Sequence, residues 1–381
     1  IKVDNKNFLE VQRVISDVLF PIPKKLQIIG VTGTNGKTTT VSLANQIACN
    51  AGRKSIAIGT LGTETSNNQT QKTHATTTPS YIDLRKILFN SGSNLEFAFI
   101  EVSSHALEQN RLYDLKLDLA AWTNFTQDHL DYHKNMETYF NSKLKIFELG
   151  RVDNFELLLP SSEGDLIDMI PNRLKSFIEV VENIPVLSNY PLFLQADYNK
   201  INLTLAYKLS EKLLIDVGTV DLTTLIPPTG RFQVFDYKKS KIIIDYAHSP
   251  DGLKQVLKTI KNVFPGFLIS VIFGCGGDRD SSKRKLMGEI ADKYSDFAII
   301  TSDNPRSEDP ALIISEIKEG IKSSNYSINS DRRQAIKEGI ESLKDDTVLL
   351  IAGKGHETYQ EIDNEKIYFS DIEEVTKYLG K

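Results

Sequence analysis

The feature that most constrains this chain is a glycine-rich segment, GVTGTNGKTTT at residues 30–40, which joins two different hydrophobic patterns. The apolar run before it, LQIIGVTG (26–33), is typical of a buried strand, and TTTVSLANQIACNAG (38–52) after it is typical of a helix. A strand, a glycine turn and a helix in that order form a phosphate-binding loop, because N–H groups at a helix N-terminus contact phosphate oxygens. We therefore predict a nucleotide-binding domain of α/β type.

The residues of this loop have separate predicted tasks. Gly33 and Gly36 let the backbone approach phosphate oxygens. Lys37 supplies positive charge to the β- and γ-phosphates, and Thr38 supplies a hydroxyl to Mg²⁺. The general pattern G-x-x-x-x-G-K-[ST] would place a glycine where this chain has Val31, so the loop is a variant. A plain glycine turn is the alternative, and Lys-Thr directly after the last glycine argues against it.

Short apolar runs alternate with helical patterns along most of the chain, which favours parallel sheets covered by helices on both faces. No clear alternation is visible between 150 and 195. The pattern breaks at the Pro227-Pro228 pair and then restarts, so a second, doubly wound unit is expected. The predicted strands are 26–33, 55–60, 97–104 and 119–125 before the break, and 241–248, 267–277, 297–303 and 347–355 after it.

Length and composition exclude several classes of protein. At roughly 150 residues per domain, 381 residues suggest two or three domains. The formal net charge of −5 gives no basic footprint for nucleic acid, and no run of about 18 apolar residues predicts membrane insertion. Two distant cysteines, Cys49 and Cys275, fit a reducing, cytoplasmic location. Because the chain starts at Ile1, we expect a fragment or a processed chain.

Acidic and imidazole side chains follow two consecutive predicted strands. Glu101 ends one strand, and His129 follows the next within DHLDYH (128–133). Because ligands bind at the carboxyl ends of parallel strands, both could reach the same site as Lys37 and bind a divalent cation. Taken singly, each could be structural, and Asp128 could simply begin a helix.

Eight motifs together resemble those of the Mur ligases, which extend a nucleotide-linked peptide during peptidoglycan synthesis. They occur in the family's order and span about residues 26–360. Among Mur ligases, the motifs resemble those of members that add diaminopimelate. The motifs are GTNGKTTT (33–40), TTTP (76–79), EVSSHALEQNR (101–111), DHLDYH (128–133), DYAHSPDGL (245–253), CGGDRD (275–280), DNPRSEDP (303–310) and AGKGHE (352–357).

The resemblance implies an organisation in domains. Residues 26–228 would form a central ATP-binding ligase domain with the phosphate loop. Residues 229–381 would form a C-terminal, Rossmann-like ligase domain that binds the incoming amino acid. Residues 1–25 would be a linker or a remnant of the family's N-terminal UDP-binding domain, which we expect to be missing here. The stretch 150–195 looks short and divergent for the family.

The resemblance also implies a reaction. ATP would phosphorylate a carboxylate of UDP-N-acetylmuramoyl-L-alanyl-D-glutamate, and an amine of meso-diaminopimelate would displace the phosphate. Mg²⁺ would be the cofactor, the enzyme a monomer, and Lys143 would act as a carbamate, although the sequence pattern alone suggests a solvated helix lysine. The implied catalytic residues are Lys37, Glu101, His129 and Lys143, and the implied metal ligands are Thr38, Glu101, His129 and carbamylated Lys143.

Three groups of binding residues follow from the same resemblance. Each group also has a simpler interpretation. TTTP could be a turn or a strand end, and Asn199 and Asn202 could cap a helix. DNPR could be a type I turn with a surface arginine. For ATP the residues are Gly33, Thr34, Asn35, Gly36, Lys37, Thr38, Thr39, Asn199, Asn202, Arg231 and Asp245. For the UDP-dipeptide they are Thr77, Thr78, Ser103, Gln109 and Arg111. For diaminopimelate they are Arg279, Asp303, Asn304, Pro305, Arg306, Gly353 and Glu357.

Charge explains why these last residues would select diaminopimelate. Its far end carries a carboxylate and an ammonium, which an arginine such as Arg306 and a carboxylate such as Glu357 can pair. Lysine has no distal carboxylate, so Arg306 would be left unpaired at a cost of about 1–3 kcal/mol.

Other functions stay open on the sequence alone. A lysine-adding tripeptide ligase or a folylpolyglutamate synthase-like ligase would share most of the motifs. A nucleotide-binding regulatory switch would need the phosphate loop but neither Lys143 nor the DNPR motif. A chain without the uridine-binding domain could also keep the family's fold and little of its activity.

Overall fold

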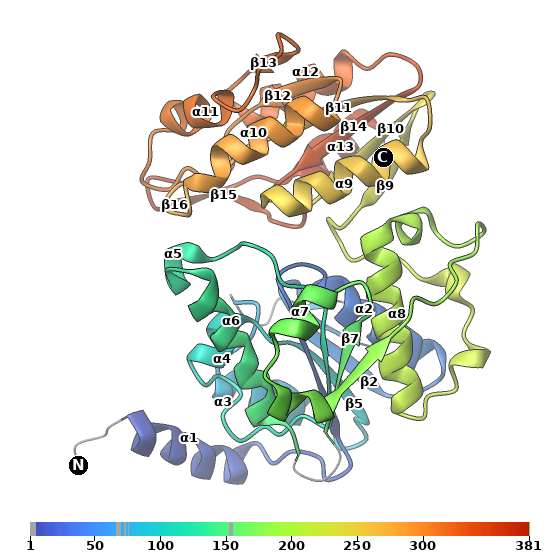
Figure 1. The fold of residues 1–381 in the computed structure, drawn as a ribbon, viewed down its shortest axis with the longest axis vertical. Coiled ribbons are helices and arrows are strands. Elements are labelled where there is room, and N and C mark those ends of the chain that lie inside the picture. Colours follow the sequence, from blue (N-terminus) through green and yellow to red (C-terminus); the bar gives the residue numbers. More distant parts are fainter. Residues whose placement is uncertain (1–4, 66–69, 72–73, 75, 152–154, 381) are drawn as a thin grey trace. The chain divides into compact units, whose positions relative to one another are not determined.

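The computed structural model describes residues 5–65, 70–71, 74, 76–151 and 155–380. They form two compact units, each described by itself (Figure 1). The first contains the described residues of Ile1–Thr126, His133–Leu194 and Tyr198–Ile226. The second contains those of Gln127–Tyr132, Gln195–Asp197 and Pro227–Lys381. Both units are α/β with mostly parallel sheets, as the sequence predicts.

The sheet of the first unit has eight strands in the order β4-β3-β2-β5-β1-β6-β7-β8. Strand β1 lies in its centre, parallel to β5 on one side and to β6 on the other. Antiparallel pairing occurs only at one edge among the described strands, where β3 pairs with β2 and with β4. The strands are β1 (Gln27–Thr32), β2 (Ser55–Gly59), β3 (Gly62–Glu64), β4 (Thr70–Gln71), β5 (Phe97–Glu101), β6 (Leu119–Trp122), β7 (Glu156–Pro160) and β8 (Ile178–Val181).

Three helices around this sheet, α3, α4 and α6, begin at polar caps. Ser80, Ser103 and Asn135 each accept a hydrogen bond from a backbone N–H in the first turn of the helix that follows. Buried apolar residues of the strands and helices, Trp122 among them, form the core of the unit. The helices are α1 (Asn5–Leu19), α2 (Lys37–Asn50), α3 (Tyr81–Asn90), α4 (Ser104–Glu108), α6 (Met136–Leu144), α7 (Gly164–Met169) and α8 (Asp197–Lys212). The short helix α5 (Leu130–His133) belongs mostly to the second unit.

The stretch 150–195, where the sequence shows no alternation, continues the parallel sheet. Strand β7 pairs with β6, and β8 pairs with β7, both in parallel. The pattern was too weak to predict them because α7 has only six residues and edge strand β8 is only partly buried. A strand that is buried on only one side does not have the continuous apolar run of a central parallel strand.

The second unit contains a six-stranded sheet in the order β13-β12-β11-β14-β10-β9, parallel except for β9. Helices α9 and α10 cover one face, in front in Figure 1, and α12 and α13 pack on the other. The strands are β9 (Gln233–Tyr237), β10 (Ser240–Asp245), β11 (Leu268–Phe273), β12 (Phe297–Ile300), β13 (Tyr326–Ile328) and β14 (Thr347–Ala352), with a separate hairpin of β15 (Tyr359–Ile362) and β16 (Glu365–Tyr368). The helices are α9 (Pro250–Val263), α10 (Ser282–Tyr294), α11 (Pro310–Lys318), α12 (Arg332–Glu341) and α13 (Asp371–Tyr378).

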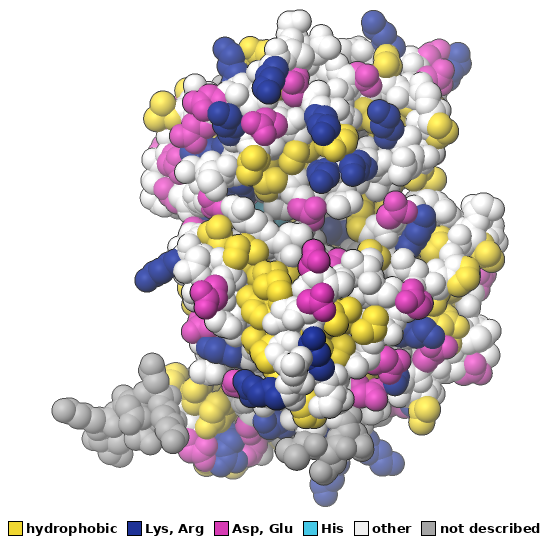
Figure 2. All heavy atoms as spheres, viewed as in Figure 1, with side chains coloured by type: hydrophobic (Ala, Val, Ile, Leu, Met, Phe, Trp, Pro, Cys, Tyr) yellow, Lys and Arg dark blue, Asp and Glu magenta, His cyan; other side chains and the backbone are white. Residues whose placement is uncertain are grey.

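The surface agrees with the composition. On the face seen in Figure 2, Lys and Arg side chains are interspersed with Asp and Glu side chains, and no continuous basic stripe is visible. Within the described part of the chain, every helix is too short or too polar to cross a membrane.

Candidate active site

The phosphate loop follows β1 in the centre of the first sheet. The helix after it, α2, begins at Lys37, and Gly36 before it has a left-handed φ of 85°. A Cβ at Gly36 would lie 2.3 Å from Asn202 Oδ1, and a Cβ at Gly33 would lie 1.9 Å from Thr123 Oγ1. Only glycine fits at either position, and the N-terminus of α2 has no side-chain cap. The loop therefore presents a helix N-terminus to an anion, as predicted for a nucleotide phosphate.

Two lysines donate to the backbone of this loop. Lys37 Nζ donates to the carbonyl oxygens of Gly33 and Thr34, at 2.9 and 2.8 Å. Lys143, from helix α6, is fully buried, and its Nζ donates to the same Gly33 oxygen at 2.7 Å. The interpretation of Lys143 as a solvated helix lysine is therefore wrong. Helical spacing shows that a residue lies on a helix, but not which neighbour covers it.

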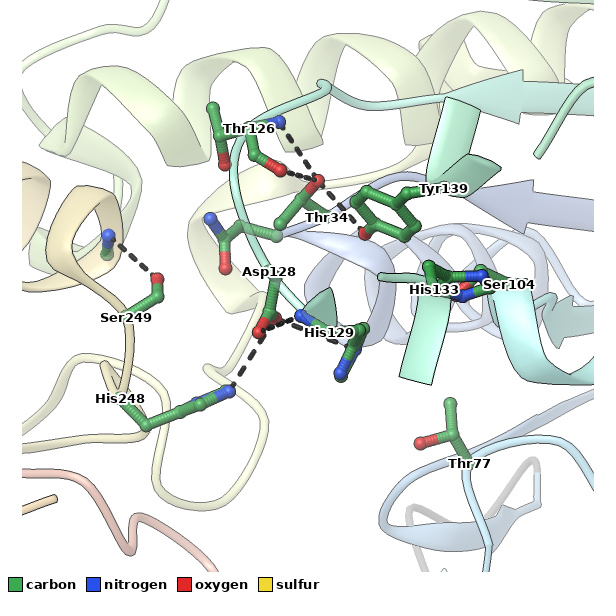
Figure 3. A network of polar contacts seen from close by, with 12 residues as sticks. Thr34, Thr77, Ser104, Thr126, Asp128, His129, His133, Tyr139, His248 and Ser249 are labelled. Carbon is green, nitrogen blue, oxygen red and sulfur yellow. Dashed lines mark hydrogen bonds and ion pairs between the residues drawn. The ribbon is translucent and has the colours of Figure 1, made fainter. Parts of the chain in front are cut away.

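Residues after β6 hold the loop in place (Figure 3). Thr34 Oγ1 donates to the Thr126 carbonyl at 3.1 Å, accepts from Thr126 N at 3.0 Å, and lies 3.2 Å from the Tyr139 hydroxyl. Asn35 N donates to Asn124 Oδ1 at 2.9 Å. Sequence reasoning missed Asn124 and Tyr139, since neither belongs to the loop motif. Tyr139 also places its ring 4.7 Å from Lys143 Nζ, one helical turn away.

The asparagine pair of α8 packs against the start of α2. Asn202 Nδ2 donates to Asn199 Oδ1 at 3.0 Å, and Asn199 Nδ2 donates to the Phe193 carbonyl at 2.9 Å. Thr40 Oγ1 donates to Asn202 Oδ1 at 3.3 Å. Both asparagines are buried, as are Thr38 and Thr39 in the first turn of α2. The structure thus places the predicted ATP residues of the first unit together.

Glu101 lies at the end of β5, next to β1 in the sheet. Its carboxylate is buried and accepts from Thr60 N at 2.8 Å and from Thr60 Oγ1 at 3.1 Å. These donors are neutral, so the carboxylate charge remains for a cation. An oxygen ligand of this kind suits Mg²⁺, as does the predicted Thr38 hydroxyl of the loop. Among the residues that the structure describes, no three His, Cys, Asp or Glu side chains gather as a metal site by themselves.

The five residues predicted for the UDP-dipeptide form one hydrogen-bonded group beside Glu101. Thr78 Oγ1 donates to the Glu101 carbonyl at 2.6 Å and to Ser103 Oγ at 3.2 Å. Arg111 reaches the Thr78 carbonyl with one nitrogen at 2.7 Å and Gln109 Oε1 with two others, at 3.0 and 2.6 Å. Thr77 lies on the same segment, and its Oγ1 accepts from Thr60 Oγ1 at 3.1 Å. Hydroxyls, an amide and a guanidinium therefore gather near the carboxyl end of β5.

His129 belongs to the short segment Gln127–Tyr132 that packs with the second unit. Its Nε2 lies 3.5 Å from Asp128 Oδ2, and His248 Nε2 lies 3.9 Å from the same oxygen (Figure 3). Burial opposes ionisation of Asp128, but the two imidazoles and the Lys283 ammonium hold its pKa below the usual value. His129 has a left-handed φ of 55°, so the segment turns sharply there. Its predicted place beside Lys37 as a metal ligand stays a prediction.

Two further ATP candidates, Arg231 and Asp245, lie together in the second unit. Asp245 ends β10 and accepts from the backbone N–H groups of Phe232 and Ala247, at 2.7 and 2.8 Å. Burial raises the pKa of the Asp245 carboxyl, while the Arg231 guanidinium acts in the opposite direction. Arg231 itself stacks over the Tyr246 ring at 4.2 Å. A cation, a carboxylate and an aromatic ring are therefore grouped after β10.

The DNPR motif follows β12 and packs against the loop of Gly277 and against strand β15. Arg306 Nε donates to Glu361 Oε2 at 3.1 Å, and its Nη1 donates to the Gly277 carbonyl at 2.6 Å. The arginine is mostly buried, so the surface reading of Arg306 is wrong. A Cβ at Gly277 would lie 1.9 Å from the Pro305 carbonyl oxygen, which shows how closely the two loops approach. Arg279 and Arg306 both lie beside Gly276, and Arg279 is half exposed.

Carboxylates complete this group. Asp303 Oδ2 is buried and accepts no hydrogen bond within the described residues. A Cβ at Gly353 would lie 2.5 Å from that oxygen, and Gly353 has a φ of 114°. Glu357 accepts from Asn304 Nδ2 at 2.9 Å and from Lys354 Nζ at 3.0 Å. The site therefore carries both signs of charge, as expected for a zwitterion. Sequence reasoning missed Lys354, although it lies inside the AGKGHE motif.

Comparison with known proteins agrees with this geometry. Residues 31–182 match the Mur ligase middle domain, and residues 230–355 match the Mur ligase, glutamate ligase domain. The chain belongs to the Mur ligase family, whose members are ATP-dependent, amide-forming ligases. Membership in a ligase family sets aside the alternative of a nucleotide-binding switch.

Individual relatives are more specific. The UDP-N-acetylmuramoyl-L-alanyl-D-glutamate–2,6-diaminopimelate ligase of Rickettsia prowazekii is 38% identical over 99% of this chain and 86% of its own length. The ligase of the same name from Aquifex aeolicus is 39% identical over 94% of this chain and 78% of its own length. A solved structure of a ligase with this name superposes with a TM-score of 0.62 at 32% identity, covering 97% of this chain and 81% of that one. A Mycobacterium tuberculosis folylpolyglutamate synthase has a TM-score of 0.71, covering 91% and 92% of the two chains, but only 15% identity, a likeness of fold alone.

Proposed function

We propose that this protein joins meso-diaminopimelate to UDP-N-acetylmuramoyl-L-alanyl-D-glutamate, with conversion of ATP to ADP and phosphate, in peptidoglycan synthesis. The observation that carries the proposal is the group of opposite charges after β12 and β14. Arg306 offers a guanidinium, and Asp303 and Glu357 offer carboxylates, with Asp303 Oδ2 against Gly353. A substrate with a carboxylate and an ammonium at its far end matches this set, whereas lysine lacks the carboxylate.

The residues of the first unit would serve the activation of the dipeptide. The N-terminus of α2 and Lys37 would hold the terminal phosphates of ATP. Thr38 and Glu101 would hold Mg²⁺, which supplies charge neutralisation for phosphoryl transfer. Lys37 then stabilises negative charge that develops on the transferred phosphoryl group, and this electrostatic effect lowers the barrier.

Lys143 has a separate proposed role. As a carbamate it would be an anion beside the loop and could orient a cation, with His129 as a further ligand. Its position supports this proposal because its Nζ reaches the Gly33 carbonyl, within the phosphate loop. An unmodified ammonium at that position would instead oppose a metal ion through like charge.

The group beside Glu101 would hold the UDP-dipeptide. Thr77, Thr78 and Ser103 offer hydroxyls to its peptide and sugar groups, and Gln109 offers an amide. Arg111 suits a carboxylate or a phosphate. Asn199, Asn202, Arg231 and Asp245 would contact the nucleotide. We propose that residues 26–228 form a central ATP-binding ligase domain, and that residues 229–381 form a C-terminal domain that binds the incoming amino acid and adds Arg231 and Asp245 to the nucleotide site. We also propose a monomer that acts in the cytoplasm, where ATP is available.

Phosphate release by the purified protein tests the proposal. Release should require ATP, the UDP-dipeptide and meso-diaminopimelate together, and should fall to background when any one is omitted. L-Lysine in place of meso-diaminopimelate should give a much lower kcat/KM. Equal or better turnover with lysine would make the protein a lysine-adding ligase, and release that needs neither the dipeptide nor an amino acid would contradict the proposed reaction.

A further inference from the structure

We propose that Lys354 is a positioning residue that fixes which polar atoms the protein offers to the far end of the incoming amino acid. This inference rests on the proposed function. Lys354 follows β14 and is fully buried. Its Nζ donates to Asn304 Oδ1 and to Glu357 Oε2, each at 3.0 Å. One ammonium thus contacts two side chains assigned to diaminopimelate, while Lys354 itself stays behind them.

The first consequence concerns the orientation of the Asn304 amide. Asn304 Oδ1 accepts from Lys354 Nζ and from Glu361 N, both at 3.0 Å. An ammonium and a backbone N–H can only donate, so the amide oxygen must face them and the amide nitrogen must face away. Asn304 Nδ2 donates one hydrogen to Glu357 at 2.9 Å. Its second hydrogen is left for the substrate, and Asn304 can therefore serve a carboxylate but not an ammonium.

The second consequence concerns Glu357. Lys354 and Asn304 both donate to the same oxygen of its carboxylate, Oε2. The other oxygen, Oε1, is therefore the one left for a donor such as the substrate's ammonium. The turn that carries both residues is closed by a hydrogen bond from Glu357 N to the Lys354 carbonyl at 2.9 Å. This turn, together with the Lys354 ammonium that Asn304 and Glu357 share, keeps the donor position on Asn304 apart from the acceptor position on Glu357.

Removal of the ammonium would undo both effects. Asn304 would lose one of the two donors that hold its oxygen, and the only charged one, so its amide would be held less firmly. Glu357, whose side chain is only 15% exposed, would lose its charge partner. A mostly buried carboxylate that has no charge partner is costly in free energy. The site would then discriminate poorly among amino acids that differ in whether they carry a distal carboxylate or a distal ammonium.

The experiment compares Lys354→Met with wild type, using the ligase reaction with purified full chain. Three amino acids are supplied: meso-diaminopimelate, 2-aminopimelate without the distal amine, and L-lysine without the distal carboxylate. We expect KM for meso-diaminopimelate to rise about 10- to 100-fold, the effect of lost bonds to charged groups. KM for ATP and for the UDP-dipeptide should stay within about twofold of wild type, and the preference among the three amino acids should shrink.

Lys366→Met is the matched control. Lys366 lies on β16 and is exposed. Its ammonium is 4.2 Å from the centre of the Tyr359 ring, and Lys354 Nζ is 5.5 Å from the centre of the same ring. This control should keep the wild-type KM values. Because Lys354 is buried, each variant's thermal unfolding is measured as well. Should Lys354→Met fail to fold, Lys354→Gln, which keeps a polar donor without the charge, takes its place and should likewise shrink the preference among the three amino acids.

The outcomes separate this inference from the proposed function. If wild type uses meso-diaminopimelate and Lys354→Met keeps its KM and its selectivity, the role of Lys354 is wrong and the proposed function stands. Equal increases in KM for all three substrates would also overturn it, since they would indicate a general loss of structure. If wild type itself ignores meso-diaminopimelate, the proposed function fails, and the assignment of Lys354 fails with it.

Discussion

Lys37 and Lys143 donate to the same carbonyl oxygen, that of Gly33, at 2.9 and 2.7 Å. They come from different helices, α2 and α6, and are 106 positions apart in the sequence. Both side chains therefore lie at the phosphate loop, where a nucleotide phosphate would bind. Each lysine can therefore be tested by removing it singly.

Replacing Lys37 by Ala should abolish ATP turnover. The variant lacks the charge that stabilises the transferred phosphoryl group, and loss of one such donor costs about 100- to 1000-fold in kcat. Phosphate release at saturating ATP measures this loss. Lys54→Ala, which removes an exposed lysine of the same unit, should behave as wild type. Near-normal hydrolysis by Lys37→Ala would refute the role of the loop.

Replacing Lys143 by Ala should also inactivate the enzyme, and a small carboxylate such as acetate or formate should restore part of the activity. The added anion would take the place of the carbamate. The measurement is the ligation rate against carboxylate concentration. Lys145→Ala is a close control, because this half-exposed lysine pairs with Glu108 instead. Full activity of unrescued Lys143→Ala would rule out the proposed role.

Replacing Arg306 by Lys should lower kcat/KM for meso-diaminopimelate by about 10- to 100-fold, because a lysine keeps the charge but cannot form a guanidinium fork. The rate with L-lysine should change little, since that substrate has no distal carboxylate. Competition between the two amino acids in one reaction measures the ratio directly. An unchanged ratio would show that Arg306 does not contact the distal carboxylate.

Replacing Arg332 by Met should destabilise the second unit by about 3–5 kcal/mol, the usual effect of breaking a buried ion pair. Arg332 and Asp371 are both fully buried, and two guanidinium nitrogens donate to the carboxylate at 2.8 and 2.7 Å. Urea unfolding gives the free energy. In Arg333→Met the exposed Arg333 loses its pair with Glu374, but Lys377 still pairs with that carboxylate, so the change should cost no more than about 1 kcal/mol. A similar small loss for Arg332→Met would contradict this account.

The ion pair of Arg284 and Glu308 should make the free energy of unfolding depend on pH. The Arg284 guanidinium, 2.8 Å away, holds the Glu308 pKa below its ordinary value of 4.5. A lowered pKa in the folded state stabilises the protein above about pH 4.5, and this contribution is lost as the pH falls. The difference in unfolding free energy between wild type and Glu308→Gln should therefore shrink between about pH 7 and about pH 3. In an Arg284→Met background the same substitution should show a smaller pH dependence, and some should remain because the Asp278 N–H still donates to the Glu308 carboxylate.

Several parts of the site could be predicted from local sequence. The phosphate loop and its helix follow from glycine spacing and from the apolar run of β1, and both are where the sequence places them. The ends of β5 and β6 were also predictable, because buried parallel strands have continuous apolar runs. The strands β7 and β8 were not, because a short helix and a half-exposed edge strand give little periodicity.

Other parts depend on contacts between distant segments. Nothing near Lys143 in the sequence indicates that it reaches Gly33, and nothing near Lys354 indicates that it joins Asn304 to Glu357. The sequence by itself determined the phosphate loop, the α/β class and the motifs of a ligase, since these depend on residues adjacent in the chain. Only the tertiary structure decided which lysines are buried and which polar atoms they bind, because burial and hydrogen bonding depend on how separate strands and helices pack.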